Sequence, residues 1–264
     1  MMNQGTKRMY MLAVAAVAAL ALAGCGGGGS GSTGGVSPAT RGPITGFGSV
    51  WVNGVEFQTD SATHRMMLDT GDDHLGGVQD CTVFRVGMIV TVRHEDGDDH
   101  ATGIEYEDNI EGPVQFLNLA DNTFEVLGQK VRYSGTTNVE HGPIDNGFVV
   151  EVSGLTGSDD VIDATYIDVK TGGSGEFEIK GYVFSVGADN TFRLGPLPGV
   201  STVTVDIAGA ILHDLPGGVL AAGQFVEVKT LSTATGRFPN AMIRATEVEG
   251  KEDIGHSEDR EDPS

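Results

Sequence analysis

Residues 90–108, with the sequence VTVRHEDGDDHATGIEYED, contain the side chains best suited to chemistry in this chain. Imidazole and carboxylate groups are good ligands for zinc, copper or nickel. The stretch therefore predicts a divalent-metal site whose ligands are His94, Asp96, Asp98 and His100. The alternative is a solvated turn, because Asp and Gly suit turn geometry. The spacing of the two histidines is not an established ligand pattern, and the stretch lacks the acid at position twelve of a calcium loop.

Catalytic motifs are absent from the rest of the sequence. No serine or cysteine lies in a recognisable nucleophile elbow, and no glycine-rich phosphate fingerprint opens a helix. An Asp-Thr-Gly triplet begins at Asp69, but Asp72, Asp73 and His74 follow it at once in a polar segment. An aspartic protease needs this triplet in an apolar strand and turn, with a second aspartate sharing the proton. We therefore expect no enzymatic activity and no cofactor.

The only tryptophan, Trp51, lies in the segment VWVNGVEF. Asn53-Gly54 predicts a two-residue type I′ turn, which requires positive φ at both central positions. This turn would pair Val50 with Phe57, Trp51 with Glu56 and Val52 with Val55, so that the four apolar residues share one face and Trp51 points outward. An outward Trp51 is expected to pack against a neighbouring module or to act as an exposed anchor for a partner, and tandem repeats favour the packing.

Three copies of one unit follow each other along the chain. Each unit has an aliphatic residue two positions before a glycine near its start, a glycine before a valine-rich strand, and a closing segment that begins Ala-Thr. Two units share the sequence ADNTF. Apolar residues alternate with period two, which indicates strands. A second hairpin is expected at Gly128, where Glu125 would face either Lys130 or Arg132.

About five strands per unit favour small closed barrels, since closure removes exposed sheet edges. The sequence predicts an all-β protein of tandem small OB-like β-barrel modules. Their expected ranges are 43–109, 110–174 and 175–249. The segments equivalent to residues 94–100 in the second and third units contain no histidine, which favours the solvated turn at that position.

The segments GFGSVWVNGVEFQTDSAT, FRVGMIVTV and ATGIEYED resemble bacterial lipoprotein modules of the domain of unknown function 5666 family. The second unit is similar to the module that usually follows, and the third is a looser match. The resemblance implies tandem OB-like barrels on an envelope lipoprotein, and it supplies no catalytic residues.

The first 25 residues have the pattern of a secretory signal. Lys7 and Arg8 precede an apolar run over residues 9–23, which is too short for a typical membrane span of about 20 residues. The sequence LAGC resembles a lipobox, which implies removal of residues 1–24 and lipidation of Cys25. Gly26 in place of aspartate implies the outer membrane, with the protein facing the periplasm. The alternative is an ordinary cleaved signal that leaves a free thiol.

The composition of the chain disfavours one class of partner and indicates the character of the segments on either side of the modules. With 16 basic and 37 acidic residues, the chain has a formal charge of −21, which disfavours nucleic-acid binding. Residues 25–42 are expected to be a Gly/Ser tether, and residues 250–264 an acidic disordered tail. Cys81 would be left as a single thiol without a disulfide partner, and its apolar neighbours indicate a core position.

Together these features predict a non-enzymatic binding or scaffolding protein of the cell envelope, held by a lipid anchor. An envelope protein or a glycan is the expected partner. Divalent-cation binding through the 94–100 loop and the acidic surface is the alternative.

We predict that Cys25→Ser releases the protein from membranes or blocks its processing, because the thiol is the expected site of lipidation. Incorporation of labelled fatty acid into the wild type and into this variant measures the effect. A wild-type chain that takes up no label contradicts the lipoprotein interpretation.

Overall fold

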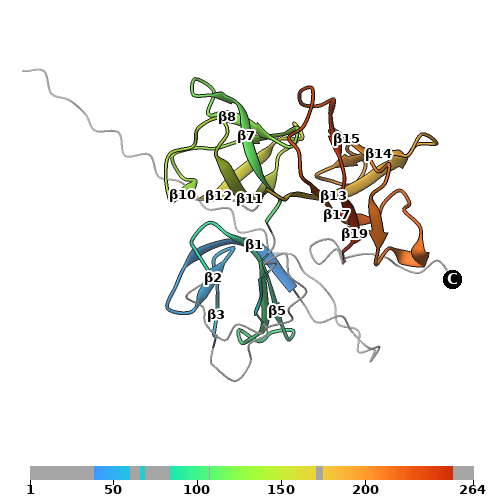
Figure 1. The fold of residues 1–264 in the computed structure, drawn as a ribbon. Coiled ribbons are helices and arrows are strands. Elements are labelled where there is room, and N and C mark those ends of the chain that lie inside the picture. The colour runs from blue at the N-terminus through green and yellow to red at the C-terminus, as the bar shows by residue number, and fades with distance from the viewer. Residues whose placement is uncertain (1–38, 60–65, 69–83, 107, 171–174, 252–264) are drawn as a thin grey trace, which may run out of the picture. The chain divides into compact units, whose positions relative to one another are not determined.

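The computed structural model describes residues 39–59, 66–68, 84–106, 108–170 and 175–251 of the chain (Figure 1). The expected signal segment, Cys25, Cys81 and residues 252–264 lie outside these ranges. The strands of the described part group into three successive modules, coloured blue to teal, green to yellow, and orange to red along the chain.

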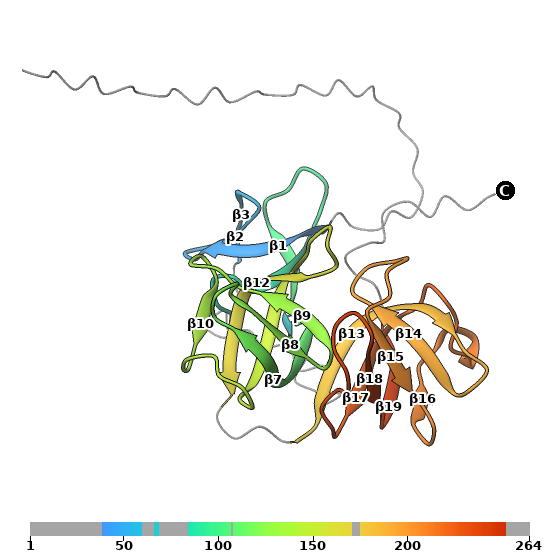
Figure 2. The ribbon, with the colours of Figure 1, turned by 90° about the horizontal axis from the view of Figure 1, so that it is seen from above.

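The second module shows the barrel most completely (Figure 2). The central strand β7 pairs antiparallel with both β8 and β11, β8 pairs with β9, and β11 pairs with β12. A parallel pairing of β9 with β12, in which Val131 lies opposite Ile162, closes the ring. This five-stranded ring is the OB-like barrel predicted from the sequence. Its strands are β7 (Ile110–Asn118), β8 (Thr123–Val126), β9 (Gln129–Arg132), β11 (Val149–Thr156) and β12 (Ile162–Lys170), with the short β10 (Asn138–Glu140) beside β12.

The other two modules repeat this order of pairing. In the first, the ring closes through a parallel bridge between Gln58 and His100. Its strands are β1 (Ala39–Gly46), β2 (Val50–Val52), β3 (Val55–Phe57), β5 (Ile89–His94) and β6 (Ala101–Tyr106), with β4 (Met66–Leu68) beside β6. In the third, the closing strand is divided into two parts, β18 and β19, and the ring closes where β15 runs parallel to β18. Its strands are β13 (Phe177–Val186), β14 (Thr191–Gly195), β15 (Val203–Asp206), β17 (Phe225–Thr230), β18 (Ala241–Arg244) and β19 (Glu247–Gly250), with β16 (Ile211–His213) beside β19.

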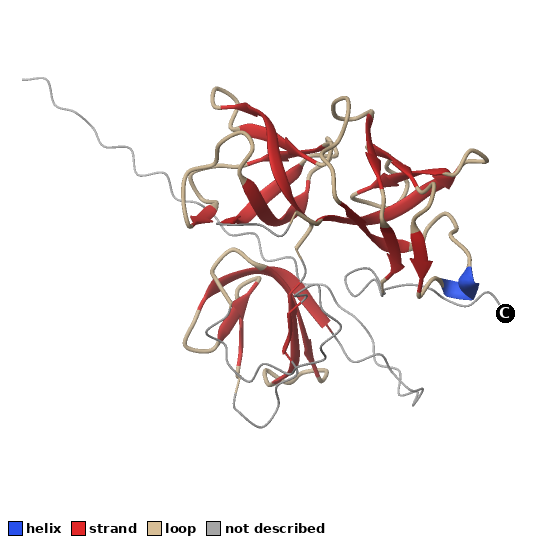
Figure 3. Cartoon of the chain, viewed as in Figure 1, coloured by secondary structure: helices blue, strands red, loops and turns tan. Residues whose placement is uncertain are grey.

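Apart from one short helical turn, the described part of the chain consists of strands and loops (Figure 3). Its single helical element is the three-residue 3-10 turn Pro216–Gly218. No helix within the described ranges is long and apolar enough to cross a bilayer.

The predicted hairpin at Asn53-Gly54 is confirmed. The two turn residues have φ values of 51° and 78°, and the pairing is Val50 with Phe57, Trp51 with Glu56, and Val52 with Val55. Val50, Val52 and Phe57 are buried as expected, but Val55 is 45% exposed. The pairing places Val55 beside Val52 on the predicted face, and this face is covered at Val52 but open to solvent at Val55.

The glycine that precedes the valine-rich strand in every unit has a conformational reason. Gly87, Gly147 and Gly223 have φ values of 96°, 85° and 86°. This left-handed region is accessible to glycine without the steric penalty that a Cβ atom brings. The repeated glycine therefore marks the same turn in each module.

Two hydrophobic cores fill the barrels. One is continuous through the second and third modules, where Ile110 in β7 pairs with Ile179 in β13. Phe124 and Phe192, the shared phenylalanines of ADNTF, are both 1% exposed within it. The core of the first module is separate and includes Tyr166 from the second module.

The boundary of the predicted tether needs correction. Residues 39–42 belong to β1, where Ala39 pairs with Arg93 and Gly42 with Val90. At the other end, Gly250 completes β19, and the backbone N–H of Lys251 donates to the carbonyl of Phe225. The expected tether and tail therefore each include residues that are part of the barrels.

Candidate functional site

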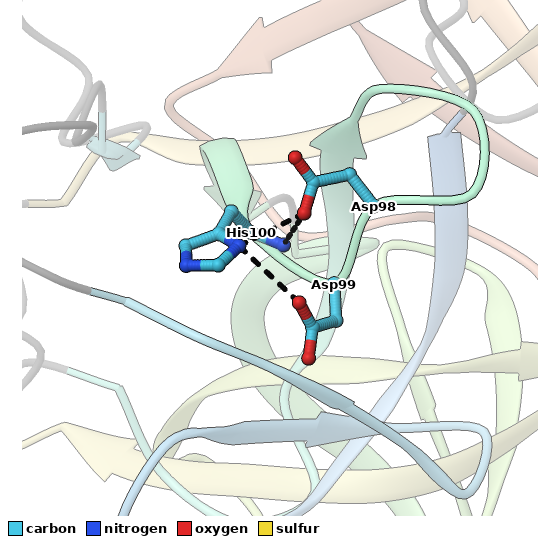
Figure 4. Close-up of side chains that lie close together, drawn as sticks. All are labelled: Asp98, Asp99 and His100. Carbon is cyan, nitrogen blue, oxygen red and sulfur yellow. Dashed lines mark hydrogen bonds and ion pairs between the residues drawn. The ribbon is translucent and has the colours of Figure 1, made fainter.

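The 94–100 loop joins β5 and β6 and brings together part of the predicted metal site (Figure 4). His100 Nδ1 lies 2.8 Å from Asp98 Oδ1 and 3.2 Å from Asp99 Oδ1. The hydrogen bond from His100 is the main reason why the pKa of Asp98 is lowered. All three side chains are exposed. These three residues can each offer one ligand atom to a common position.

The other two predicted ligands, His94 and Asp96, are not in this cluster. The His94 ring makes hydrogen bonds at both nitrogens, to Thr40 Oγ1 at 3.1 Å and to the Glu95 carbonyl at 3.0 Å. It also packs on Phe57, with ring centroids 5.0 Å apart. His94 is therefore a structural residue, and the predicted set of four ligands is not assembled.

Hydrogen bonds within the loop explain most of its polar sequence. The N–H of Asp98 donates to the Glu95 carbonyl at 3.0 Å, and the N–H of His100 donates to Asp98 Oδ1 at 3.0 Å. Gly97 has a φ of 77°. These are the local side-chain and backbone interactions that favour Asp and Gly in turns.

Trp51 points outward, as the hairpin register predicts. Its side chain is 37% exposed and lies opposite Gly46 in the neighbouring strand of its own module. Trp51 is therefore not fully buried, and its packing against a neighbouring module stays a prediction. As an exposed aromatic side chain, it remains a candidate contact for a partner.

Other residues connect the first and second modules. The N–H of Ile89 donates to Ser153 Oγ at 2.9 Å, and Thr165 Oγ1 donates to the Gly87 carbonyl at 2.5 Å. A Cβ atom on Gly87 would lie 2.3 Å from the carbonyl oxygen of Thr165, so only glycine allows this approach. The tight contact and the buried Tyr166 join the two barrels.

A pocket of about 320 Å³ is lined by residues from all three modules. This volume is at the lower end of the range of small-molecule sites. Charged residues and apolar residues both line it. They are Arg41, Asp108, Asn109, Gln129, Gly154, Leu155, Thr156, Ile162, Ile179, Lys180, Tyr182, Gly195, Pro196, Leu197, Thr202 and Phe225.

Buried charges lie at one side of the pocket. The ammonium of Lys180, with a side chain only 2% exposed, is 2.5 Å from Asp108 Oδ1 and 3.0 Å from Glu178 Oε1. Glu227 Oε2 lies 3.8 Å away. Glu227 also lies 3.6 Å from Lys229 Nζ and 3.5 Å from Lys251 Nζ, so three lysines and three carboxylates form one cluster. A buried charge of this kind is tolerated only when it is paired and hydrogen-bonded.

Glu178 shows the electrostatic consequence of this crowding. Burial, and then the negative charge of Asp108, raise its pKa to about 8, although the Lys180 ammonium acts in the opposite direction. Glu178 therefore binds a proton more readily in the folded protein than an exposed glutamate does.

Sequence reasoning did not identify the pocket or its charged residues. Lys180 lies between Ile179 and Gly181, which are the aliphatic residue and the glycine repeated near the start of each unit. A lysine at this apolar position is the sequence feature that indicates a buried charge. Asp108 immediately precedes the second module. Their proximity depends on the β7–β13 pairing, which brings Glu178 opposite Glu111.

The fold and the pocket define a tandem OB-like β-barrel protein. A family described as "Domain of unknown function (DUF5666)" matches residues 41–105, 111–168 and 180–249, which together make up well over half of the chain. The chain belongs to this family, and the three matches follow the three modules. No curated protein matches the chain.

We predict that His100→Ala changes the free energy of unfolding by no more than about 0.5 kcal/mol, as most surface substitutions do. His94→Ala, the matched variant, should cost more, about 1 kcal/mol, because it removes the bond to Thr40 and the packing on Phe57. Zinc titration should show no stoichiometric micromolar binding. Such binding, lost in His100→Ala and kept in His94→Ala, would establish a cation site.

A second prediction concerns pH. The pKa of Glu178 is raised in the folded state from 4.5 to about 8, so the stability that its protonation provides is present below pH 4.5 and is lost as pH rises through 8. In the wild type the free energy of unfolding should fall between pH 5 and 8, and Glu178→Gln should make this fall less steep, by up to about 1.4 kcal/mol per pH unit. Urea denaturation at several pH values measures this. The exposed control Glu95→Gln should follow the wild type, and an unchanged slope in Glu178→Gln contradicts the prediction.

Proposed function

We propose that this chain is a non-enzymatic binding protein of the bacterial cell envelope, whose site is the pocket lined by all three modules. Lipidation of Cys25 would hold it on the outer membrane, facing the periplasm. The observation that supports binding is the pocket itself: it has a volume of about 320 Å³ and combines buried charges with apolar walls. Ligand sites typically combine an apolar lining with a few placed polar groups.

The tandem arrangement supports the same proposal. No single module supplies the pocket, since Arg41 comes from the first, Leu155 from the second and Tyr182 from the third. Gln129 and Thr202, both 1% exposed, join the second and third modules by a hydrogen bond of 2.7 Å at the wall. This buried hydrogen bond links two modules at the wall of the pocket.

Exposed aromatic residues support a scaffolding role toward an envelope protein or a glycan. Phe116 and Phe184 lie at the irregular part of the first strand of their modules, and Phe47 directly follows the first strand of its module. The three side chains are 42%, 46% and 46% exposed, respectively. Together with Trp51 they give each of the three barrels an outward aromatic contact. The formal charge of −21 argues against a nucleic-acid partner.

Divalent-cation binding is the second candidate function. It is favoured by the approach of Asp98, Asp99 and His100, whose ligand atoms lie within 4.8 Å of one another. Their exposure weakens this candidate, because exposed acidic groups are commonly solvated without a bound ion.

The test of the binding function is native mass spectrometry of the protein purified from its own cell envelopes. We expect a bound molecule that is released on denaturation. Leu155→Trp, which adds bulk at the pocket, should lower its occupancy, whereas Leu119→Trp on an exposed turn of the same module should not. A wild-type protein that carries no molecule, and acquires none from an envelope extract, contradicts the proposal.

A further inference from the structure

The guanidinium of Arg41 is a positive charge at the pocket that has no partner. Arg41 lines the pocket, and no described residue forms an ion pair or a hydrogen bond with its side chain. Every other described arginine donates to an acceptor within 3.5 Å; these are Arg85, Arg93, Arg132, Arg193, Arg237 and Arg244. In a chain with 37 acidic and 16 basic residues, an arginine that is bonded to none of the acids and faces a pocket is available to a ligand.

The position of Arg41 in β1 directs its side chain away from the first barrel. Gly42 and Ile44 are buried, and Ile44 belongs to the core of the first module. Side chains alternate between the two faces of a strand, so Arg41 points outward. Its backbone is held on both sides, because it pairs with Thr91 of β5 and its carbonyl accepts a hydrogen bond from Asn53 Nδ2 at 2.7 Å. The guanidinium is therefore the part of Arg41 that is free to meet a ligand.

A second donor at the pocket is the side-chain amide of Asn109, the residue before β7. Its Oδ1 accepts a hydrogen bond from the N–H of Gly154 at 2.7 Å, which directs Nδ2 elsewhere. Within the described residues, this Nδ2 has no acceptor. Neither Asn109 Nδ2 nor the Arg41 guanidinium is shut off from solvent, whereas Asp108 Oδ2 is, so a ligand can reach both donors.

The charges of the lining favour an anion. The charged residues among the lining are Arg41, Asp108 and Lys180. Asp108 and Lys180 bond each other at 2.5 Å, so Arg41 is the charge of the lining that remains unpaired. A guanidinium is a planar fork that binds a carboxylate through two parallel hydrogen bonds. A single unpaired guanidinium therefore matches a single carboxylate group.

Aromatic and aliphatic side chains form another part of the lining. Tyr182 and Phe225 lie there with ring centroids 5.0 Å apart, and Leu155 and Leu197 line the pocket as well. Transfer of an apolar group from water to such walls is favourable. The volume of about 320 Å³ is at the lower end of the range for small-molecule sites, so the ligand is small.

From these observations we infer that the pocket binds a small monocarboxylate with an apolar body. Its carboxylate pairs with the Arg41 guanidinium, Asn109 Nδ2 offers a further donor, and its body occupies the part lined by Tyr182 and Phe225. This inference rests on the proposed binding function and names the chemical class of its ligand.

Three probes of similar shape test the inference: benzoate, benzyl alcohol and benzylamine. Calorimetric titration into the full-length chain, purified from cells and freed of bound molecules, should show one benzoate site. Benzyl alcohol should bind roughly tenfold more weakly, because a neutral hydroxyl is a weaker acceptor for a guanidinium than a carboxylate is. Benzylamine should not bind, because its ammonium repels the guanidinium. Equal affinity for benzoate and benzyl alcohol, or preferential binding of benzylamine, overturns the inference.

Two arginine variants locate the binding. Arg41→Gln should weaken benzoate binding roughly tenfold and so abolish its preference over benzyl alcohol. The matched control Arg244→Gln removes the same charge at an exposed position outside the pocket lining, and it should bind benzoate as the wild type does. Full benzoate affinity in Arg41→Gln, or an equal loss in both variants, overturns the inference.

A second pair of variants decides if Arg41→Gln fails to fold, as judged by circular dichroism. Leu155→Trp should weaken benzoate binding because it adds bulk at the pocket, whereas Leu119→Trp should leave it unchanged. Benzoate binding that Leu155→Trp does not affect lies outside the pocket and overturns the inference.

The outcomes separate this inference from the proposed function. A natural ligand that is lost in Leu155→Trp but kept in Arg41→Gln, together with no binding of benzoate, would leave the binding function in place and refute the carboxylate. Absence of both a natural ligand and benzoate binding would refute both.

Discussion

The ammonium of Lys180 is the interaction on which the centre of this molecule depends. Its side chain is 2% exposed, and it comes from the first strand of the third module, whereas its closest partner, Asp108, precedes the second module. Removal of one member of a buried ion pair leaves an uncompensated charge, which typically costs about 3–5 kcal/mol. The pair therefore fixes how the third module meets the start of the second. Glu178 and Glu227 extend the constraint within β13 and β17.

The backbone reinforces this junction. The pairing of β7 with β13 makes one sheet of the second and third modules, and their apolar residues form one core. The first module is joined differently, through Gly87, Ser153 and the buried Tyr166. A repeat protein gains stability from such contacts between neighbours, because each small barrel alone buries a limited apolar surface. A pocket whose walls come from all three modules is a consequence of this packing.

Local rules made much of the fold predictable. Asn53-Gly54 determined its hairpin register, and the glycine before each valine-rich strand reflected a required positive φ. At Gly128 the sequence is compatible with two registers, and the structure has the one in which Glu125 lies opposite Lys130. Even there the side chain makes its ion pair elsewhere, with Arg237 at 3.0 Å, a residue more than a hundred positions away. Propensity and periodicity carry no information about such distant partners.

The candidate site also depends on contacts between residues that are distant in sequence. Closeness in sequence predicts that His94 and His100 act together, but His94 is bonded to Thr40, a residue whose surroundings in sequence have the composition of a tether. Because β1 begins at Ala39, Thr40 is in place to bond His94 at the end of β5, whereas His100 lies in the exposed loop. Asp108 and Lys180 are 72 positions apart and became neighbours only through the β7–β13 pairing.

The location of the pocket has a thermodynamic consequence for the whole chain. A ligand that binds only when the three modules are in contact stabilises that arrangement by an amount that grows with its concentration relative to Kd. Binding at a junction, in contrast to binding on the surface of one barrel, therefore couples occupancy to the relative positions of the modules. The exposed aromatic residues of the three barrels are held in their spacing by the contacts between the modules, and a ligand at the junction would add to those contacts.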